Sequence, residues 1–202
     1  HAPWPRAVVD FDGWCAMIEA LAAGRLTLVS LWGERDRVHA AASADNTIGV
    51  FSLDCPDQRF PSVGAAHAPA IRLERAVHDL FGLAPTGAKD TRPWLDHGRW
   101  SIKHPLGVAV KAPEAMARSY PFLPVEGENL HVIPVGPVHA GIIEPGHFRF
   151  NVNGEAVVRL EERLGYVHKG IDQLMLGRSL EQAVRLAGRT SGDSTVAYAL
   201  AF

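Results

Sequence analysis

The chain has 202 residues, of which 47% are hydrophobic, and its 19 glycines and 14 prolines indicate many turns. This composition suits one large or two small globular domains and is unlike that of a disordered chain. A formal net charge of −2 at pH 7 gives no global basic field, which argues against a nucleic-acid partner. No apolar run reaches the roughly 18 to 20 residues that a membrane span requires, so any membrane role must come through partner subunits.

A first helix is predicted over residues 10–24, with Asp10 or Asp12 as its N-cap and Gly24 near its end. Its apolar residues recur at three- and four-residue steps: Trp14, Met17, Ile18 and Leu21. This is the spacing of one helix face, which is expected to be buried.

Three strands are predicted next, over 26–33, 37–44 and 47–54. Arg-Asp at 35–36 and Asp-Asn at 45–46 supply the turn chemistry between them. A helix followed by an antiparallel meander favours an α+β fold of one sheet packed with helices.

The two cysteines, Cys15 and Cys55, lie far apart in the sequence. They cannot form a C-x-x-C motif, and an iron–sulfur cluster normally needs about four thiolates. A disulfide between them would be unusual in a reducing compartment. We therefore interpret both as ordinary core thiols.

A second helix is predicted to end at Gly82, because the apolar residues before it form one stripe. These residues are Ala70, Leu73, Val77, Leu80 and Phe81. From 85 to 130, prolines and glycines interrupt any long element, while aromatic residues argue against a free linker. We interpret 85–130 as an extended strap that runs over another surface.

After the strap, strands are predicted over 131–138 and 147–152, and a hairpin turn at 152–155 leads to a returning strand at 155–160. The pattern is helical from about Gly170 onward. These elements again belong to an α+β arrangement.

Two groups of motifs resemble known families. The first is LERAVHDLFGL at 73–83, with FPSV at 60–63 before it and HPLG at 104–107 after it. It resembles the C-type subunit of NADH:quinone oxidoreductase (complex I), whose signature helix carries E-R-x-x-x-D, then Leu or Met, then F-G, after an F-P-S element. The matching residues are Glu74, Arg75, Asp79, Leu80, Phe81 and Gly82. His78 and Ala76 stand where that family usually has Tyr and Glu.

The second group is IPVGPVHAGIIEPGHFRFNVNGE at 133–155, continuing to GYVHKGID at 165–172. It resembles the start of the D-type subunit of complex I and of the homologous large subunit of membrane-bound nickel–iron hydrogenases. The spacing from G-P-x-H to E-P-G-H-F-R, and the fusion of C-type to D-type sequence, favour the hydrogenase-4 and formate hydrogenlyase branch.

The resemblance implies a C-type α+β domain over 1–84, the strap over 85–130, and the opening hairpins and helices of a larger D-type domain over 131–202. His1 is not a natural start, and the apolar end at 199–202 has no stop signal, so we expect the polypeptide to continue. Implied partners are iron–sulfur and membrane-arm subunits, at the cytoplasmic, peripheral face of the inner (cell) membrane.

In those hydrogenases the first pair of nickel ligands lies in R-x-C-G-x-C, after the Y-V-H-[RK]-G element. The corresponding residues here are Arg189, Thr190, Ser191, Gly192, Asp193 and Ser194. Serine hydroxyls do not deprotonate near neutral pH and cannot replace bridging thiolates. We therefore expect neither a nickel–iron centre nor another metal site in this chain.

In complex I the quinone headgroup is held between a His in the first hairpin loop and a Tyr shortly after an Arg. His139 lies in the corresponding loop, which is about two residues longer here, while Ser191 and Gly192 stand near the Tyr position. The nearest tyrosine is Tyr198. We expect no cofactor on this segment itself, with quinone as the candidate ligand of the full complex.

The catalytic candidates are His139, Glu144, Arg189 and Asp193. The candidates for cofactor contact are His139, His147 and His168. Histidine titrates near neutrality and Arg189 offers a fixed fork of donors, so these groups could move protons or anchor a quinone-like ligand. The structural alternative is that they hydrogen-bond the hairpin loops and cap helices, with Asp193 or Ser194 capping the last one.

Two functions follow as hypotheses. The first is a peripheral-arm subunit of an NADH:quinone oxidoreductase-like or hydrogenase-related complex that contributes to electron transfer to quinone or another acceptor. The second is a non-catalytic scaffold that docks an iron–sulfur subunit onto a membrane arm, which the aromatic-rich strap and the serines favour. Direct NADH binding is not predicted, because no G-x-G-x-x-G joins a strand to a helix. This segment alone is not expected to be an active enzyme.

Overall fold

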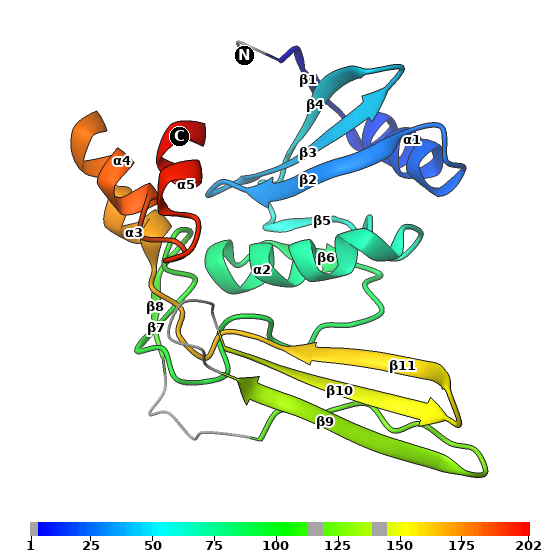
Figure 1. Ribbon diagram of the computed structural model, residues 1–202. Coiled ribbons are helices and arrows are strands. Elements are labelled where there is room, and N and C mark those ends of the chain that lie inside the picture. The colour runs from blue at the N-terminus through cyan, green and yellow to red at the C-terminus, as the bar shows by residue number, and fades with distance from the viewer. Residues whose placement is uncertain (1–3, 113–118, 139–144) are drawn as a thin grey trace. The chain divides into compact units, whose positions relative to one another are not determined.

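The computed structural model describes residues 4–112, 119–138 and 145–202 (Figure 1). The site candidates His139 and Glu144 lie outside these described residues. Contacts within the chain divide it into two compact units, His1–Met116 and Ala117–Phe202. This division falls inside the segment 85–130, and the division into three parts stays a prediction.

The first unit contains a four-stranded sheet with the order β1-β4-β3-β2. Its strands are β1 (Arg6–Val9), β2 (Thr27–Gly33), β3 (Arg37–Ala44) and β4 (Thr47–Asp54). The antiparallel meander of β2, β3 and β4 confirms the three predicted strands. Strand β1 was not predicted; it is a short edge strand that runs parallel to β4.

The turn between β3 and β4 sets the register of the meander. Asp45 and Asn46 have φ angles of 48° and 61°, in the left-handed region that these two residue types tolerate better than most. Two such residues in a row are typical of the tight turn that matches strand twist. The Asp-Asn pair was therefore a correct turn signal.

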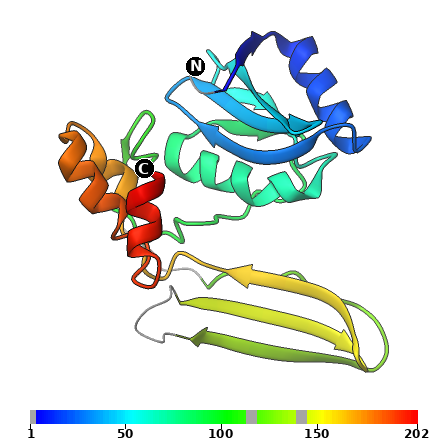
Figure 2. The ribbon, with the colours of Figure 1, turned by 45° about the horizontal axis from the view of Figure 1, so that its top comes forward.

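Helix α1 (Phe11–Ala22) begins after Asp10, whose carboxylate accepts a hydrogen bond from Gly13 N at 2.9 Å. This confirms Asp10 as the N-cap. The predicted apolar residues of the helix are all buried: Trp14, Met17, Ile18 and Leu21. They form one core with sheet residues such as Leu31 and Val38, and Figures 1 and 2 show α1 lying along the sheet.

Helix α2 (Ile71–Phe81) follows a short 3₁₀ turn, η1 (Ala68–Ala70), and lies beside β2. It ends as predicted at Gly82, whose φ of 82° is readily adopted only by a residue without a Cβ atom. The ring of Phe81 packs so closely on Gly33 of β2 that a Cβ atom there would approach it to 2.9 Å.

Two small sheets complete the first unit. Strand β5 (Arg59–Pro61) pairs in parallel with β6 (Ala84–Thr86), and β7 (Ile102–Lys103) pairs antiparallel with β8 (Val110–Lys111). The proline-rich segment therefore contributes β7 and β8, and most of β6, to the first unit.

The turn at 104–107, which is the HPLG motif, closes the C-terminal end of α2. His104 Nδ1 lies 2.8 Å from the carbonyl oxygen of His78, and Leu106 N donates to Leu80 O at 2.9 Å. These contacts give partners to carbonyl groups near the end of a helix, where intrahelical donors run out.

Gly107 makes the closest approach in this turn. A Cβ atom at this position would stand 2.1 Å from the carbonyl oxygen of Phe81 and 2.7 Å from its carbonyl carbon. Both atoms belong to the backbone, so a side chain could be accommodated only by moving the turn away from α2.

The second unit contains a three-stranded antiparallel sheet with the order β11-β10-β9. Its strands are β9 (Leu130–Val138), β10 (Gly146–Asn153) and β11 (Ala156–Arg163). They confirm the three predicted strands, and Gly154 has the positive φ of 57° that the predicted hairpin turn requires.

Three helices follow in the second unit: α3 (Ile171–Met175), α4 (Leu180–Ala187) and α5 (Thr195–Ala201). Helix α4 begins with a capping box between Ser179 and Gln182. Ser194 occupies the N-cap position of α5, as predicted. Its side chain makes no capping hydrogen bond, so the predicted capping interaction is wrong. Across the described ranges, no helix is both long and apolar enough to cross a membrane.

Replacing Gly107 by alanine should destabilise the first unit. The added Cβ would force the turn off the Phe81 backbone, and overpacking of this kind typically costs about 1–3 kcal/mol. The matched control is Gly49→Ala, because a Cβ at Gly49 meets nothing within 4 Å. Urea unfolding of both variants measures the difference; equal midpoints would contradict the docking of the turn on α2.

Candidate functional site

His147 lies on one side of β10, among polar side chains. Its Nε2 atom is shielded from solvent and has no hydrogen-bond partner in the part of the chain that is described. The ring meets Phe122 edge to face, with ring centroids 5.2 Å apart. The imidazole is thus held in place by packing, with one nitrogen left to interact with another group.

Three further side chains near His147 also hold shielded nitrogen atoms without a described partner: Arg149 Nε, Asn151 Nδ2 and Arg163 Nε. Asn151 is only 3% exposed. His147 lies opposite Arg163 across the strands, and Arg149 lies opposite Glu161. We call these five residues the polar face.

The polar face was missed in the sequence, although a signal for it was present. Along β10 its residues alternate with apolar ones: His147, Phe148, Arg149, Phe150, Asn151 and Val152. A period of two places every second residue on the same side of a strand. The strand itself was predicted, and this alternation could also have grouped His147 with Arg149 and Asn151.

The segment 121–124 lies against the polar face. The Phe122 ring stands 5.3 Å from the guanidinium carbon of Arg149, and Leu123 N donates to both carboxylate oxygens of Glu161, at 3.2 and 3.0 Å. Shielded donors such as guanidinium and amide nitrogens need an acceptor. A carboxylate, a carbonyl oxygen or water is the partner that this arrangement suits.

The other described candidates lie in a different part of the second unit. His168 precedes α3, whereas Arg189 and Asp193 lie between α4 and α5, and all three are exposed. Lys169 Nζ donates to Thr190 O at 3.0 Å, which brings the 168–169 turn to this loop. The structure therefore groups His168 with Arg189 and Asp193 in the neighbourhood of one loop, and places His147 on the sheet.

The serines that replace the hydrogenase cysteines belong to this loop. Ser191 Oγ donates to the Asp193 carboxylate, and Thr195 Oγ1 donates to Ser191 O at 3.4 Å. Residues 4–112, 119–138 and 145–202 contain no group of three or more His, Cys, Asp or Glu side chains that could hold a metal ion. The absence of a nickel–iron centre remains a prediction from the chemistry of Ser191 and Ser194.

Both cysteines are free thiols. Cys55 is fully buried, and burial raises the pKa of its thiol to about 11, so it is a poor nucleophile near neutral pH. Cys15 is partly exposed in α1, which is less buried than a core thiol would be.

A polar row that was not predicted crosses the sheet of the first unit, with His39 and Ser52 as its buried members. Ser52 Oγ lies 2.8 Å from His39 Nδ1 and accepts a hydrogen bond from Arg6 Nε at 2.7 Å. His39 Nε2 lies 3.3 Å from Glu34 Oε1, yet burial lowers the pKa of His39. A serine, a histidine and a carboxylate in series suggest a hydrolase, but Ser52 is fully buried and no substrate can reach it. This row is structural.

The signature helix α2 buries three charged side chains, beginning with Glu74 at 2% exposure. The Glu74 carboxylate accepts hydrogen bonds from Val63 N at 2.5 Å, Ser62 Oγ at 2.8 Å and Gly64 N at 3.1 Å. Burial raises the pKa of Glu74, although these bonds act in the opposite direction. The helix thereby holds the loop that contains the FPSV motif.

Arg75 holds the start of the proline-rich segment. Its guanidinium donates to Arg92 O at 2.6 Å and to Pro93 O at 2.9 Å, and lies 3.2 Å from the Asp90 carboxylate. The guanidinium carbon also stands 4.9 Å from the centre of a Trp94 ring. A side chain that is 6% exposed thus has both a counter-ion and backbone acceptors.

Asp79 holds the next part of the same segment. A single carboxylate oxygen accepts hydrogen bonds from Trp94 N, Leu95 N and Asp96 N at 2.8, 2.7 and 3.2 Å. Burial acts to raise the pKa of Asp79, but bonds from His78 and from these backbone groups outweigh it and the pKa is lowered. The E-R-x-x-x-D motif is therefore a set of three anchors for two loops.

Asp79→Asn should lower the free energy of unfolding by about 2 kcal/mol at pH 7, since hydrogen bonds to charged groups typically contribute about 1.5–3 kcal/mol. The folded-state pKa of Asp79 is lowered, so its contribution is present above the unfolded value of about 3.9 and is lost as pH falls through the folded value. The loss in Asp79→Asn should therefore shrink near pH 4 and below, as measured by urea unfolding at several pH values.

Glu74→Gln should show the opposite pH dependence. The raised pKa of Glu74 means that its contribution is present below the unfolded value of about 4.3 and is lost as pH rises through the folded value. The variant should therefore lose less stability at pH 7 than near pH 4. Glu19→Gln, on the exposed side of α1, is the control and should change stability by less than about 0.5 kcal/mol at either pH. The same trend in all three variants would contradict the assignment.

Comparison with known proteins places these features in a family. Residues 14–115, about half of the chain, match the family model of the respiratory-chain NADH dehydrogenase 30 kDa subunit. This range contains α2 and both of the loops that its buried charges hold.

The chain is 34% identical over 158 residues to hydrogenase-4 component G of Escherichia coli (strain K12), an alignment that covers 74% of this chain and 28% of that protein. It is 32% identical over 159 residues to formate hydrogenlyase subunit 5 of the same organism, with coverage of 74% and 28%. It is 24% identical over 151 residues to the fused C/D subunit of NADH-quinone oxidoreductase from Bacteroides thetaiotaomicron, with coverage of 64% and 28%. The chain thus spans less than a third of the length of these relatives.

The family match confirms the resemblance that the motifs at 60–63 and 73–83 indicated. The similar proteins confirm the predicted relation to C/D fusion subunits and to hydrogenases of the hydrogenase-4 and formate hydrogenlyase type. The chain belongs to the family of the respiratory-chain NADH dehydrogenase 30 kDa subunit.

Proposed function

We propose that this chain is part of a peripheral subunit of a membrane-bound redox complex, of the class that contains NADH:quinone oxidoreductases and membrane-bound hydrogenases. The observation that carries the proposal is the buried network of Glu74, Arg75 and Asp79, which gives the family motif a physical role in this chain. Family membership of residues 14–115 and the similarity to subunits of such complexes support it.

The proposed partners are an iron–sulfur subunit and the subunits of a membrane arm, with the complex at the cytoplasmic face of the cell membrane. The buried charged anchors of α2 fix two loops of the first unit, which suits this unit to bracing such partners. Since the described residues hold no membrane-spanning helix, attachment to the membrane would come through these partners.

Within this role, the first proposal is a contribution to electron transfer to quinone or another acceptor. His147 has a shielded nitrogen with no hydrogen-bond partner among residues 4–112, 119–138 and 145–202. Arg189 is exposed beside the His168 turn, as a donor to an external ligand requires. His139 and Glu144 complete the proposed set. Ser191 and Ser194 make a nickel–iron centre an unsuitable alternative.

The second proposal is a scaffold that docks the iron–sulfur subunit without taking part in the chemistry. It is favoured by one observation in the first unit: the buried charges of α2 are occupied in holding loops 62–64 and 90–96. Groups that are used in this way are not free to act on a substrate. Quinone chemistry would then belong to another part of the full protein or to a partner.

The two proposals predict different results in the complex isolated from membranes of the source organism. Arg189→Ala and His139→Ala should lower quinone-dependent turnover by about tenfold or more, without loss of assembled complex, if this chain contributes to electron transfer. Under the scaffold proposal these variants keep normal turnover, whereas Glu74→Ala lowers the amount of complex seen by native electrophoresis. Glu19→Gln is the control for both readouts.

Recovery of the full-length chain from those membranes without iron–sulfur or membrane-arm subunits would contradict both proposals. So would normal assembly and normal turnover in all the variants, because neither the polar residues nor the α2 anchors would then matter to the complex.

A further inference from the structure

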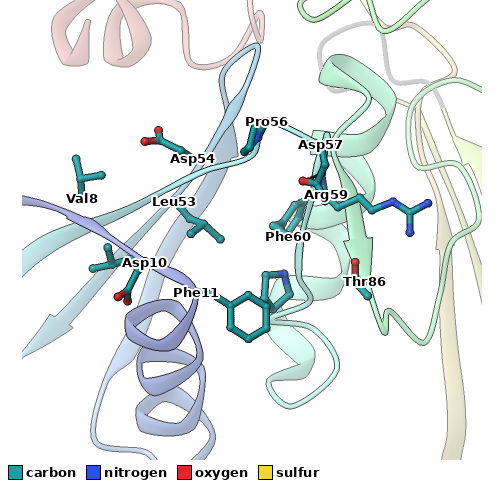
Figure 3. A pocket seen from close by; sticks show the side chains of 12 residues that line it. Val8, Asp10, Phe11, Leu53, Asp54, Pro56, Asp57, Arg59, Phe60 and Thr86 are labelled. Carbon is teal, nitrogen blue, oxygen red and sulfur yellow. Dashed lines mark hydrogen bonds between the residues drawn. The ribbon is translucent and has the colours of Figure 1, made fainter.

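A groove of about 980 Å³ lies on the first unit, and none of its lining residues belongs to α2. Figure 3 shows it between the start of α1, the end of β4 and strand β5. Phe11, Leu53 and Phe60 come from these three elements and meet in its middle. The floor of the groove is therefore apolar.

Two apolar side chains at the groove are unusually exposed for their size. Val8 is 60% exposed and Phe11 is 63% exposed. Both line the groove, at separate places on its wall. Exposed apolar side chains beside a concave surface are typical of an interaction site.

The groove also follows the edges of two strands. All three residues of β5 line it, as do Val8 and Val9 of β1. Because alternate residues of a strand point to opposite sides, a surface that touches consecutive residues runs along the strand edge. Strand β1 pairs with β4 on one side only among the described residues, so its other edge offers backbone donors and acceptors to an added strand. Strand β5 offers fewer such groups, because Pro61 O already accepts a hydrogen bond from Trp14 Nε1 at 3.0 Å and Arg59 N donates to Asp57 Oδ1 at 3.3 Å.

The rim of the groove is acidic. The lining residues include Asp10, Asp54 and Asp57, with Arg59 as the basic one. Asp54 is ion-paired with Arg37, which leaves Asp10 and Asp57 as the carboxylates at this rim. In Figure 3 the Arg59 side chain extends away from the apolar centre. A basic side chain of a bound segment would therefore meet these two carboxylates.

We propose that this groove binds an extended apolar segment of a partner subunit, which adds along the β1 edge and places a Lys or Arg side chain at the acidic rim. The segment buries Val8 and Phe11 and supplies backbone hydrogen bonds to the strand edge. This proposal rests on the proposed function, because it takes the partner to be another subunit of the same complex.

The test uses the full-length protein in its complex, with the photo-crosslinking amino acid benzoylphenylalanine in place of Phe11. The exposed position of Phe11 allows this aromatic replacement without disturbing the core. Irradiation should link residue 11 to one segment of a partner subunit, and mass spectrometry should show that segment to be apolar with at least one Lys or Arg. A link to an acidic segment, to a second copy of this chain, or to no protein would overturn the proposal.

Further variants separate the groove from the rest of the surface. Val8→Asp should lower the crosslinking yield by about tenfold, because it puts a charge into the apolar contact. Asp10→Asn with Asp57→Asn should lower it by about threefold, and asparagine at position 10 still caps α1. Val29→Asp is the matched control on β2, where Val29 is 52% exposed, and should leave the yield unchanged. A yield that Val8→Asp does not lower, or that Val29→Asp lowers equally, would overturn the assignment.

Failure of the groove proposal and failure of the proposed function give different results. Co-purification of the unmodified chain with its partner subunits, measured first, tests the function alone. Intact co-purification without a crosslink at residue 11 overturns the groove and leaves the function standing. Absence of co-purifying subunits overturns the function, and with it the partner on which the groove proposal rests.

Discussion

The first unit depends on the burial of three charged side chains on one short helix. Charged groups are costly to bury unless every one of them is paired or hydrogen-bonded. Glu74, Arg75 and Asp79 meet this condition with loop backbone and with Asp90. The loops in turn are held by the helix, so the helix and the loops support each other. The turn at 104–107 adds a further anchor at the end of the same helix.

Much of this fold could be predicted because its signals are local. The α1 stripe, the Asp-Asn turn, Gly82 and the hairpin turn after β10 each depend on residues close in sequence, and all were right. Strand β1 was missed because four residues are too few to show a period, and its partner β4 lies more than forty residues away. The buried state of Glu74 and Asp79 was missed for a similar reason: their partners are backbone groups of distant loops, which leave no pattern in the sequence.

The candidate site was harder to predict than the fold. The resemblance pointed to single residues, whereas the structure groups them by strand face and by loop. His147 belongs with Arg149, Asn151 and Arg163, a set that becomes visible only once the pairing of β10 with β11 is known. His168 was assigned to the same site as His147 but lies with Lys169 near the 189–193 loop. The polar face and the 189–193 loop both carry side chains that can donate hydrogen bonds to a ligand, as the proposed redox subunit would need.

The way in which Asp79 holds its loop has a consequence for sequence variation. The carboxylate bonds to the backbone nitrogens of residues 94–96, and not to their side chains. Every amino acid except proline has a backbone N–H that can donate such a bond, so this contact tolerates almost any substitution at the three positions. The aspartate has no such freedom, because a longer or neutral side chain would misplace or weaken all three bonds at once. Related chains should therefore keep the helix acid while the loop that it holds diverges, which makes the helix a better marker of kinship than the loop.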